Sequence, residues 1–224
     1  MNEILAVEEC KWTEHQKLFL DLKEQYGLKD IGLLFIFFFN IMRLKRGEAV
    51  VITPNEPHAY ISGDLVECMA NSDNVVRGGL TPKLKDKETL YHMLPYHTLG
   101  VERSPVKGNP VFKSDSCETV EYKTGFEEFR VFKVEVNRMS GKEMKLRFKT
   151  FSMAIVISGS GHVHMPTFSD DEKLNNFIIK KDNAYYIMPE QEFSFINDGE
   201  DETLVVFIAN CDIWIKTDLF VNFL

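Results

Sequence analysis

The chain has 224 residues, of which 44% are hydrophobic and 27% are charged. This composition excludes a disordered chain, a collagen-like fibre and a coiled coil, and the length suffices for one large domain or two small ones with a buried core. With 26 basic and 34 acidic residues and no basic block, the net charge of -8 argues against binding to nucleic acid or to an anionic membrane.

The first part of the chain is predicted to begin with a helix and to continue as short strands. Apolar residues recur at spacings of three and four over about Lys11 to Tyr26, which indicates a helix. Thr13 with Gln16 is typical of a capping box, and Gly27 is a natural stop. Short strands are then expected at Phe37 to Leu44, Glu48 to Thr53, Ala59 to Ile61 and Leu65 to Met69.

The middle of the chain is predicted to be a connector between two strand regions. A short helix is expected over Asp86 to Leu94. The segment from Arg103 to Tyr122 is polar, has no periodicity and is interrupted by proline and glycine, so we expect it to connect rather than to pair.

A second strand region is predicted from Phe129 onward. Phe132, Val134 and Val136 alternate with charged residues, the period-two pattern of a half-buried strand. Met153 to Ile157 and His162 to Met165 flank a Ser-Gly-Ser-Gly turn and predict a hairpin. Further strands are expected at Asn176 to Ile179, Tyr185 to Met188, Phe193 to Ile196 and Leu204 to Ala209. Residues 1–100, 101–128 and 129–224 are thus the three predicted parts of a mainly β protein.

The cysteines and the apolar runs predict a cytoplasmic location. The four cysteines, Cys10, Cys68, Cys117 and Cys211, are far apart and form no CxxC pair, which favours reduced thiols. The first ten residues, MNEILAVEEC, lack the basic start and apolar core of a signal peptide. The longest apolar stretch, Ile31 to Met42, is shorter than the roughly 20 residues that a membrane helix needs. We expect this stretch to be a buried strand.

Polar residues of many types are concentrated between Thr53 and Lys83, among short apolar segments. His58 follows a predicted strand, where a neutral imidazole is suited to bind zinc, although a surface-loop histidine gives the same pattern. His162 and His164 lie two residues apart on a predicted strand and are expected to be sheet-face residues rather than metal ligands.

Three further residues of this segment have side chains suited to proton transfer or to anion binding. Glu67 is a candidate base if it is semi-buried, but an outward-facing strand position explains it equally well. Arg77 precedes Gly78-Gly79, where a backbone without side chains lets a ligand approach closely, and its guanidinium suits phosphate or a developing enediolate. Lys83 is a candidate phosphate ligand, or else a solvated surface lysine.

Type I mannose-6-phosphate isomerases (phosphomannose isomerases) have a signature segment that resembles the run from Asn55 to Lys83, NEPHAYISGDLVECMANSDNVVRGGLTPK. The similarity extends more loosely from about Leu18 to Tyr96, and it is weak from Phe129 onward, where it depends on strand order and the SGSG turn. The resemblance implies cupin-type β-barrels (a double-stranded β-helix or jelly roll), with an N-terminal helix and a short helix between the barrels. Residues 1–100 are expected to contain the helix and the C-terminal strands of an incomplete active barrel, and 101–128 the connector. The second cupin-like barrel, at 129–224, is expected to lack a metal site.

The resemblance also implies a reaction, a cofactor and a set of site residues. It implies a zinc-dependent isomerase that interconverts mannose 6-phosphate and fructose 6-phosphate through a cis-enediol, in mannose and GDP-mannose metabolism. His58 matches the zinc-binding histidine of the family, and Arg77 matches its active-site arginine. Tyr60, Asp73, Asn74 and Lys83 match substrate-binding neighbours, and Glu67 is the candidate base.

The chain departs from the family in length and in its zinc ligands. The segments that carry the other ligands, QIHPDK and HKPE in the family, do not occur here. We therefore expect a truncated chain with an incomplete zinc site, and self-association through strands that lack partners. The alternative is a non-catalytic cupin that binds a sugar phosphate, or that completes its barrel with another chain, and uses Arg77 and Lys83 for the anion.

Overall fold

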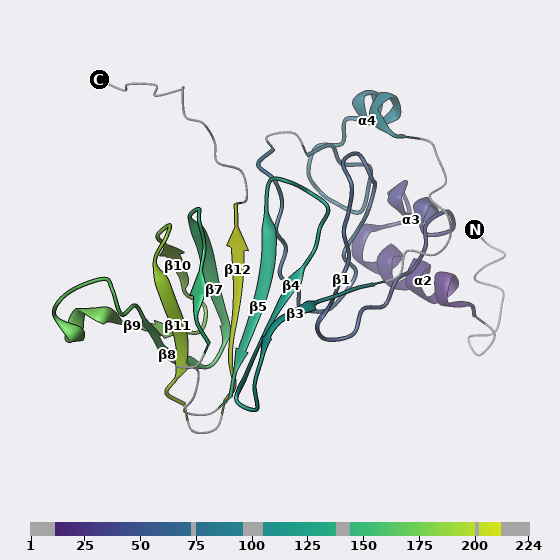
Figure 1. Ribbon diagram of the computed structural model, residues 1–224. Helices are drawn as coiled ribbons and strands as arrows, with labels where there is room; N and C mark the ends of the chain where they lie inside the picture. Colours follow the sequence, from purple (N-terminus) through teal and green to yellow (C-terminus); the bar gives the residue numbers. More distant parts are fainter. Residues whose placement is uncertain (1–11, 73–74, 96–104, 138–143, 200–201, 212–224) are drawn as a thin grey trace, which may run out of the picture. The chain divides into compact units, whose positions relative to one another are not determined.

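The computed structural model describes residues 12–72, 75–95, 105–137, 144–199 and 202–211. The chain divides into two compact units. Unit 1 comprises Met1–Lys45, Ile52–Ser62 and Ser72–Ser104, and unit 2 comprises Arg46–Val51, Gly63–Asn71 and Pro105–Leu224. Antiparallel sheets dominate the fold and a few helices accompany them, as the predicted fold class requires (Figure 1). In the described part of the chain, no helix is long and apolar enough to cross a membrane.

Unit 1 begins with the predicted helix, α2 (Glu14–Tyr26). The Gln16 backbone N–H donates to Thr13 Oγ1 at 3.3 Å, and the Thr13 N–H donates to Gln16 Oε1 at 2.8 Å. This reciprocal pair satisfies two backbone N–H groups at the helix start, so the predicted capping box is confirmed. Gly27, at φ 79, ends the helix as predicted.

A small apolar cluster holds α2 against α3 (Gly32–Phe35). Phe19 and Leu22 from α2 are buried with Leu33 and Ile36, and Leu80 packs against them from a distant part of the chain. The stretch that was expected to be a buried strand, Ile31 to Met42, is therefore a helical turn and an irregular segment. That prediction is wrong because the apolar residues pack on one side of a turn rather than between two neighbouring strands.

The second predicted helix of unit 1 is also present, as α4 (Lys87–Met93). Asp86 is its N-cap and accepts from the Thr89 N–H at 3.0 Å and from the Thr89 hydroxyl at 2.7 Å. These two hydrogen bonds lower the pKa of the Asp86 carboxyl below its ordinary value.

The strands predicted between Phe37 and Met69 are mostly absent. Of Phe37 to Leu44, Glu48 to Thr53, Ala59 to Ile61 and Leu65 to Met69, the structure keeps only β1 (Glu48–Ala49), which pairs with β2 (Val106–Lys107). A strand forms only where its N–H and C=O groups meet a neighbour. Within the described residues of this stretch, β1 is the one segment that is paired as a strand.

Unit 2 contains two antiparallel sheets whose apolar faces share one core (Figure 1). The six-stranded sheet has the order β10 (Ala184–Ile187), β7 (Ser152–Ser158), β12 (Leu204–Asn210), β5 (Arg130–Val136), β4 (Cys117–Tyr122) and β3 (Asn109–Lys113). The four-stranded sheet has the order β6 (Leu146–Arg147), β11 (Glu192–Asn197), β8 (Ser160–His164) and β9 (Asn176–Lys180). A 3-10 turn, η2 (Glu172–Asn175), precedes β9.

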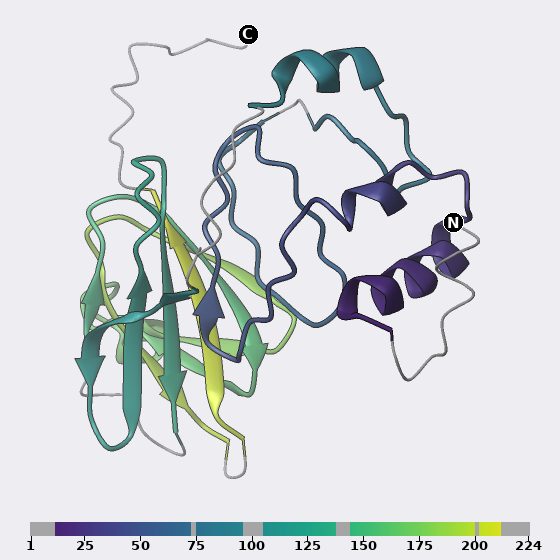
Figure 2. The same ribbon diagram turned by 90° about the vertical axis from the view of Figure 1, so that its right-hand side faces the viewer.

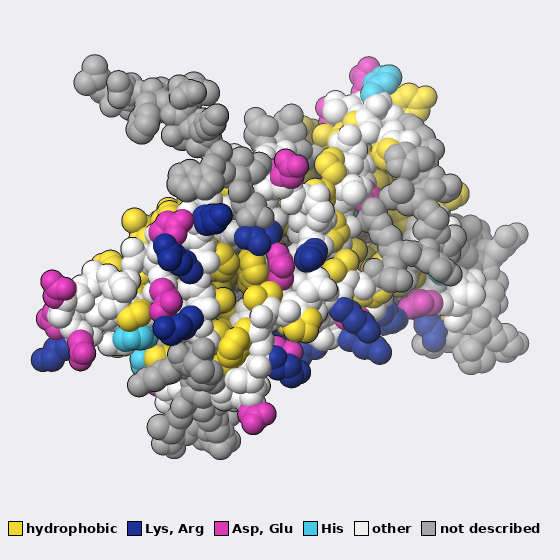
Figure 3. All heavy atoms as spheres, viewed as in Figure 1, with side chains coloured by type: hydrophobic (Ala, Val, Ile, Leu, Met, Phe, Trp, Pro, Cys, Tyr) yellow, Lys and Arg dark blue, Asp and Glu magenta, His cyan; other side chains and the backbone are white. Residues whose placement is uncertain are grey.

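Alternating side chains from both sheets fill the core of unit 2. Val134 and Val136 of β5, Phe193 and Phe195 of β11 and Val206 of β12 are at most 1% exposed. The period-two pattern predicted from Phe132 to Val136 is thereby confirmed, because its apolar members are buried and its charged members are not. On the face of the molecule shown in Figure 3, other hydrophobic side chains reach the surface among lysines and arginines.

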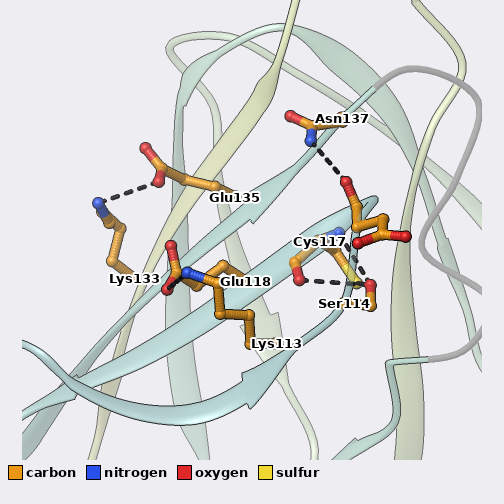
Figure 4. Close-up of polar contacts among 8 residues, drawn as sticks. Lys113, Ser114, Cys117, Glu118, Lys133, Glu135 and Asn137 are labelled. Atoms are coloured by element: carbon orange, nitrogen blue, oxygen red, sulfur yellow. Dashed lines mark hydrogen bonds and ion pairs between the residues drawn. The ribbon is translucent and has the colours of Figure 1, made fainter.

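The predicted connector contributes strands to unit 2. β2, β3 and β4 all lie within Arg103 to Tyr122, and β4 pairs with β5 along its whole length. Figure 4 shows the turn between β3 and β4, where Ser114 Oγ accepts from the Cys117 N–H at 3.1 Å and Lys113 pairs with Glu118 at 3.2 Å. The exposed residues of the segment lie mainly on β3, whereas the residues of β4 are buried or half-buried.

The predicted hairpin around the Ser-Gly-Ser-Gly turn is also wrong, although both of its strands exist. β7 pairs with β10 and β12, whereas β8 pairs with β9 and β11, so the chain passes from one sheet to the other at Gly159. Gly159 has φ +78, and a Cβ there would lie 2.9 Å from the Leu204 Cα. Glycine is therefore required at this corner for both backbone conformation and space.

Candidate functional site

His58 and Tyr60 lie together in an extended, exposed segment of unit 1. His58 Nδ1 is 2.8 Å from the Glu56 carbonyl oxygen, and the two rings are 5.6 Å apart between centroids. A carbonyl oxygen only accepts, so Nδ1 carries a proton, and Nε2 is the ring nitrogen left for a ligand. Glu56 in turn accepts from the Thr53 N–H at 3.0 Å, which holds the turn before His58. The arrangement presents one imidazole nitrogen for a ligand.

Arg77 and Lys83 lie on one loop of unit 1, the segment that leads into α4. The Arg77 guanidinium donates to the Val75 carbonyl at 3.4 Å, and the Lys83 N–H donates to Thr81 Oγ1 at 3.2 Å. Within the residues that the structure describes, neither cation forms an ion pair. Within these described residues, neither charge is paired with a carboxylate, and binding of an anion by Arg77 and Lys83 stays a prediction.

Asp30 anchors this loop and was missed by the sequence reasoning. Its Oδ1 accepts from the Leu80 N–H at 3.0 Å and from the Gly32 N–H at 2.8 Å, and its Oδ2 lies 2.8 Å from Lys85 Nζ. Burial would by itself raise the pKa of the carboxyl, but hydrogen bonds from Lys85, Leu80 and Gly32 outweigh it and hold this pKa below its ordinary value. The Asp-Ile-Gly sequence indicates a local turn, but it contains no signal of the distant Leu80 partner.

Glu67 belongs to unit 2, and its environment differs from the semi-buried one that a base was predicted to need. It is exposed, and it lies outside any strand. The next residue, Cys68, is half-buried, and burial raises the pKa of its thiol. Cys68 is thus a protonated thiol at neutral pH. Asp73 and Asn74 lie outside the described residues.

The two histidines of β8 are sheet-face residues, as predicted. His162 Nδ1 lies 2.8 Å from Asp198 Oδ2, and His164 Nδ1 lies 3.0 Å from Asn176 Oδ1, while the intervening Val163 faces the core. Among all described residues, no group of three or more His, Cys, Asp or Glu side chains is placed to hold a metal ion. The described part of the chain therefore does not form a zinc site by itself.

Comparison with solved structures finds vicilins and an RmlC-like cupin. The vicilin of Solanum melongena is 14% identical, with a TM-score of 0.42 over 47% of this chain and 30% of that one. An RmlC-like cupin from Shewanella frigidimarina is 7% identical, with a TM-score of 0.35 over 54% of this chain and 93% of that one. No family model matches the chain.

Comparison with curated proteins finds mannose-6-phosphate isomerases. The protein of that name from Cryptococcus neoformans is 42% identical over 149 residues, which are 65% of this chain and 33% of the relative. The Emericella nidulans protein is 32% identical over 92% of this chain and 46% of the relative, and the Arabidopsis thaliana protein, mannose-6-phosphate isomerase 2, is 48% identical over 128 residues. The chain spans less than half the length of these curated relatives. It is a partial homologue of the mannose-6-phosphate isomerases.

Proposed function

We propose that this chain takes part in the interconversion of mannose 6-phosphate and fructose 6-phosphate. The observation that carries the proposal is the loop with Arg77 and Lys83, two cations without a carboxylate partner in the described residues. Sequence identity of 32–48% to proteins named mannose-6-phosphate isomerase supports the choice of substrate. Two cations on one loop suit a substrate that carries a phosphate and that develops negative charge on an enediolate oxygen, because lysine can bind the first and arginine can stabilise the second.

The proposed chemistry is a proton transfer between neighbouring carbons. A base removes the C2 proton of the aldose while the C1 carbonyl oxygen gains a proton, which gives the cis-enediol. The proton then returns to C1, and the C2 hydroxyl loses its proton to become the ketone, so that the reaction is redox-neutral overall. Glu67 is proposed as the base from the family resemblance, and Arg77 is proposed to stabilise negative charge on the enediolate oxygen. Tyr60, Asp73, Asn74 and Lys83 are proposed substrate contacts.

Zinc dependence is part of the proposal, but the described residues do not fit a zinc site. His58 is proposed to supply one ligand through Nε2, and further ligands would have to come from outside the described residues. From the family resemblance, we also propose a cytoplasmic location and a role in mannose and GDP-mannose metabolism. We further propose that the chain associates with itself through exposed apolar side chains. Phe38, which is 82% exposed, and Met69, which is 60% exposed, are the side chains that such association would cover.

A second candidate is a non-catalytic sugar-phosphate-binding protein. The observation in its favour is that both cations lie on one anchored loop within unit 1, so that anion binding needs no other part of the chain. The two candidates differ in one property, the exchange of the C2 proton of the substrate with solvent.

The test measures isomerisation and C2 proton exchange by the full chain with added zinc in deuterated water. Arg77→Met is expected to lower kcat/KM by about 100-fold, because it removes a group that stabilises transition-state charge. Arg43→Met is the matched control, since Arg43 is also an exposed arginine of unit 1 but pairs with Glu14. Saturable binding of mannose 6-phosphate without exchange would support the second candidate. Absence of both binding and exchange would overturn both.

A further inference from the structure

Leu80 links the Arg77–Lys83 loop to the rest of unit 1 by a backbone hydrogen bond. Its backbone N–H donates to Asp30, whose side chain is only 5% exposed, and the same carboxylate is paired with Lys85, which is 28% exposed. The loop passes beside the start of α3 (Figure 2). Hydrogen bonds to a buried charge are stronger than neutral ones, and an N–H that loses such a partner is left unsatisfied.

Leu80 has a backbone conformation that it would not adopt in isolation. Its φ is 50°, in the left-handed region that disfavours residues with a branched side chain. Two contacts keep it there. One is the hydrogen bond to Asp30, and the other is the packing of its side chain against the cluster of Phe19, Leu22 and Leu33. A strained residue that is held from both sides fixes the path of the loop before and after it.

The glycines on each side of this contact let two backbones touch. A Cβ at Gly79 would lie 2.5 Å from the Gly32 Cα, and a Cβ at Gly32 would lie 2.8 Å from the Leu80 backbone nitrogen. No larger residue fits at either position without moving one backbone away from the other. The Asp30–Gly32 turn and the Gly79–Leu80 turn therefore form a fixed junction, and Arg77 and Lys83 extend from its two sides.

We propose that Asp30 is a positioning residue that sets the placement of Arg77 and Lys83 for binding the sugar phosphate. This inference rests on the proposed sugar-phosphate binding. Asp30 itself does not touch the substrate. It acts by holding the Leu80 N–H, so that the two cations keep one geometry before the anion arrives and little ordering is needed on binding.

The experiment combines amide hydrogen exchange at Leu80 with the Kd for mannose 6-phosphate, measured on the full chain by calorimetry. Asp30→Ala removes the acceptor and is expected to speed Leu80 exchange and to raise Kd by about 10-fold or more. Asp30→Asn keeps an oxygen that accepts from both N–H groups, so exchange is expected to remain slow and Kd to rise by no more than about 3-fold. If binding instead depended on the negative charge of Asp30, Asp30→Asn would not keep Kd close to that of the unsubstituted chain.

Asp86→Ala is the matched control. It also removes an aspartate that accepts a backbone N–H in unit 1, but from α4 rather than from the loop. It is expected to lower the melting temperature and to leave both Leu80 exchange and Kd unchanged. A purely structural role for Asp30 would instead make the two alanine variants alike in Kd.

The outcomes separate this inference from the proposed function. If the unsubstituted chain does not bind mannose 6-phosphate, the proposed function fails and the inference fails with it. If it binds, and Asp30→Ala speeds Leu80 exchange without changing Kd, only the inference is overturned. Should Asp30→Ala fail to fold, Leu80 exchange and Kd are measured on Asp30→Asn and Lys85→Met instead. A Kd that rises about 10-fold in either while Leu80 stays protected would show that charge rather than position is responsible, which contradicts the proposal.

Discussion

The sequences of unit 1 and unit 2 both contain apolar runs that predict strands, yet among the described residues only unit 2 forms β-sheets. In unit 2, every strand from β3 to β12 has a partner, and the side chains of both sheets meet in one core. In unit 1, the buried cluster consists of Phe19, Leu22, Leu33 and Ile36, and the chain around it is irregular. Apolar runs thus become strands only where neighbouring backbone satisfies their N–H and C=O groups.

The comparison also separates two kinds of stabilisation. Unit 2 is held by non-polar burial, which is spread over many side chains. Unit 1 depends on a few specific contacts, namely the Asp30 junction, the Thr13 capping box and the Phe19 cluster. Substitutions in unit 2 are therefore expected to act through lost volume, and those in unit 1 through individual hydrogen bonds as well.

The largest effect is expected in the core of unit 2. Phe193 is fully buried and lies 5.9 Å from Phe148 and 5.6 Å from Phe195, between ring centroids. Phe193→Ala is expected to lower the free energy of unfolding by about 4 kcal/mol, because it removes apolar contacts and leaves a cavity. Urea unfolding measures this change in the free energy of unfolding. Ile178→Ala on β9, a side chain that is 83% exposed, is the control and should change stability by less than about 0.5 kcal/mol.

A smaller and more local effect is expected in unit 1. Phe19 is 2% exposed and packs against Phe37 at 5.7 Å between centroids. Phe19→Ala is expected to destabilise unit 1 by about 3 kcal/mol. Far-ultraviolet circular dichroism in urea should show the helical signal lost before the sheet signal, since the α-helices of the described chain all belong to unit 1. A single transition in which both signals shift together would contradict the separation of the two units.

The Asp30 junction predicts a pH dependence that unit 2 should not share. Because the pKa of Asp30 is lowered on folding, its contribution to stability is fully present above the unfolded value of about 3.8 and is lost as the pH falls through the folded value. The helical signal at fixed urea is therefore expected to decrease below about pH 4. Asp30→Asn removes this titration. If the variant keeps the full acid sensitivity of the unsubstituted chain, another carboxyl is responsible.

The smallest predicted effect is at the start of α2. Thr13→Ala removes the side-chain acceptor of the capping box and is expected to cost about 1 kcal/mol, measured as a lower midpoint of the helical transition. Thr13→Ser keeps the hydroxyl and serves as the control. An alanine variant as stable as the serine variant would mean that Gln16 alone closes the helix end.

The local elements of this protein follow from its sequence. The capping box at Thr13, the end of α2 at Gly27, the helix after Asp86 and the alternation from Phe132 to Val136 all depend on residues close in the chain. The signature segment likewise identified the relatives, because it is long and specific. The same segment predicts that Arg77 and Lys83 bind an anion, and this role stays a prediction.

Only the tertiary structure decided which apolar segments pair and what holds the candidate site. The SGSG segment connects two sheets instead of closing a hairpin, because Gly159 packs against Leu204 from a distant strand. Leu80 adopts its left-handed conformation because Asp30, far away in the sequence, accepts its N–H. Periodicity and turn chemistry describe each residue's own preferences. Strand partners and buried hydrogen bonds belong to pairs of residues, and these pairs form only when the chain folds.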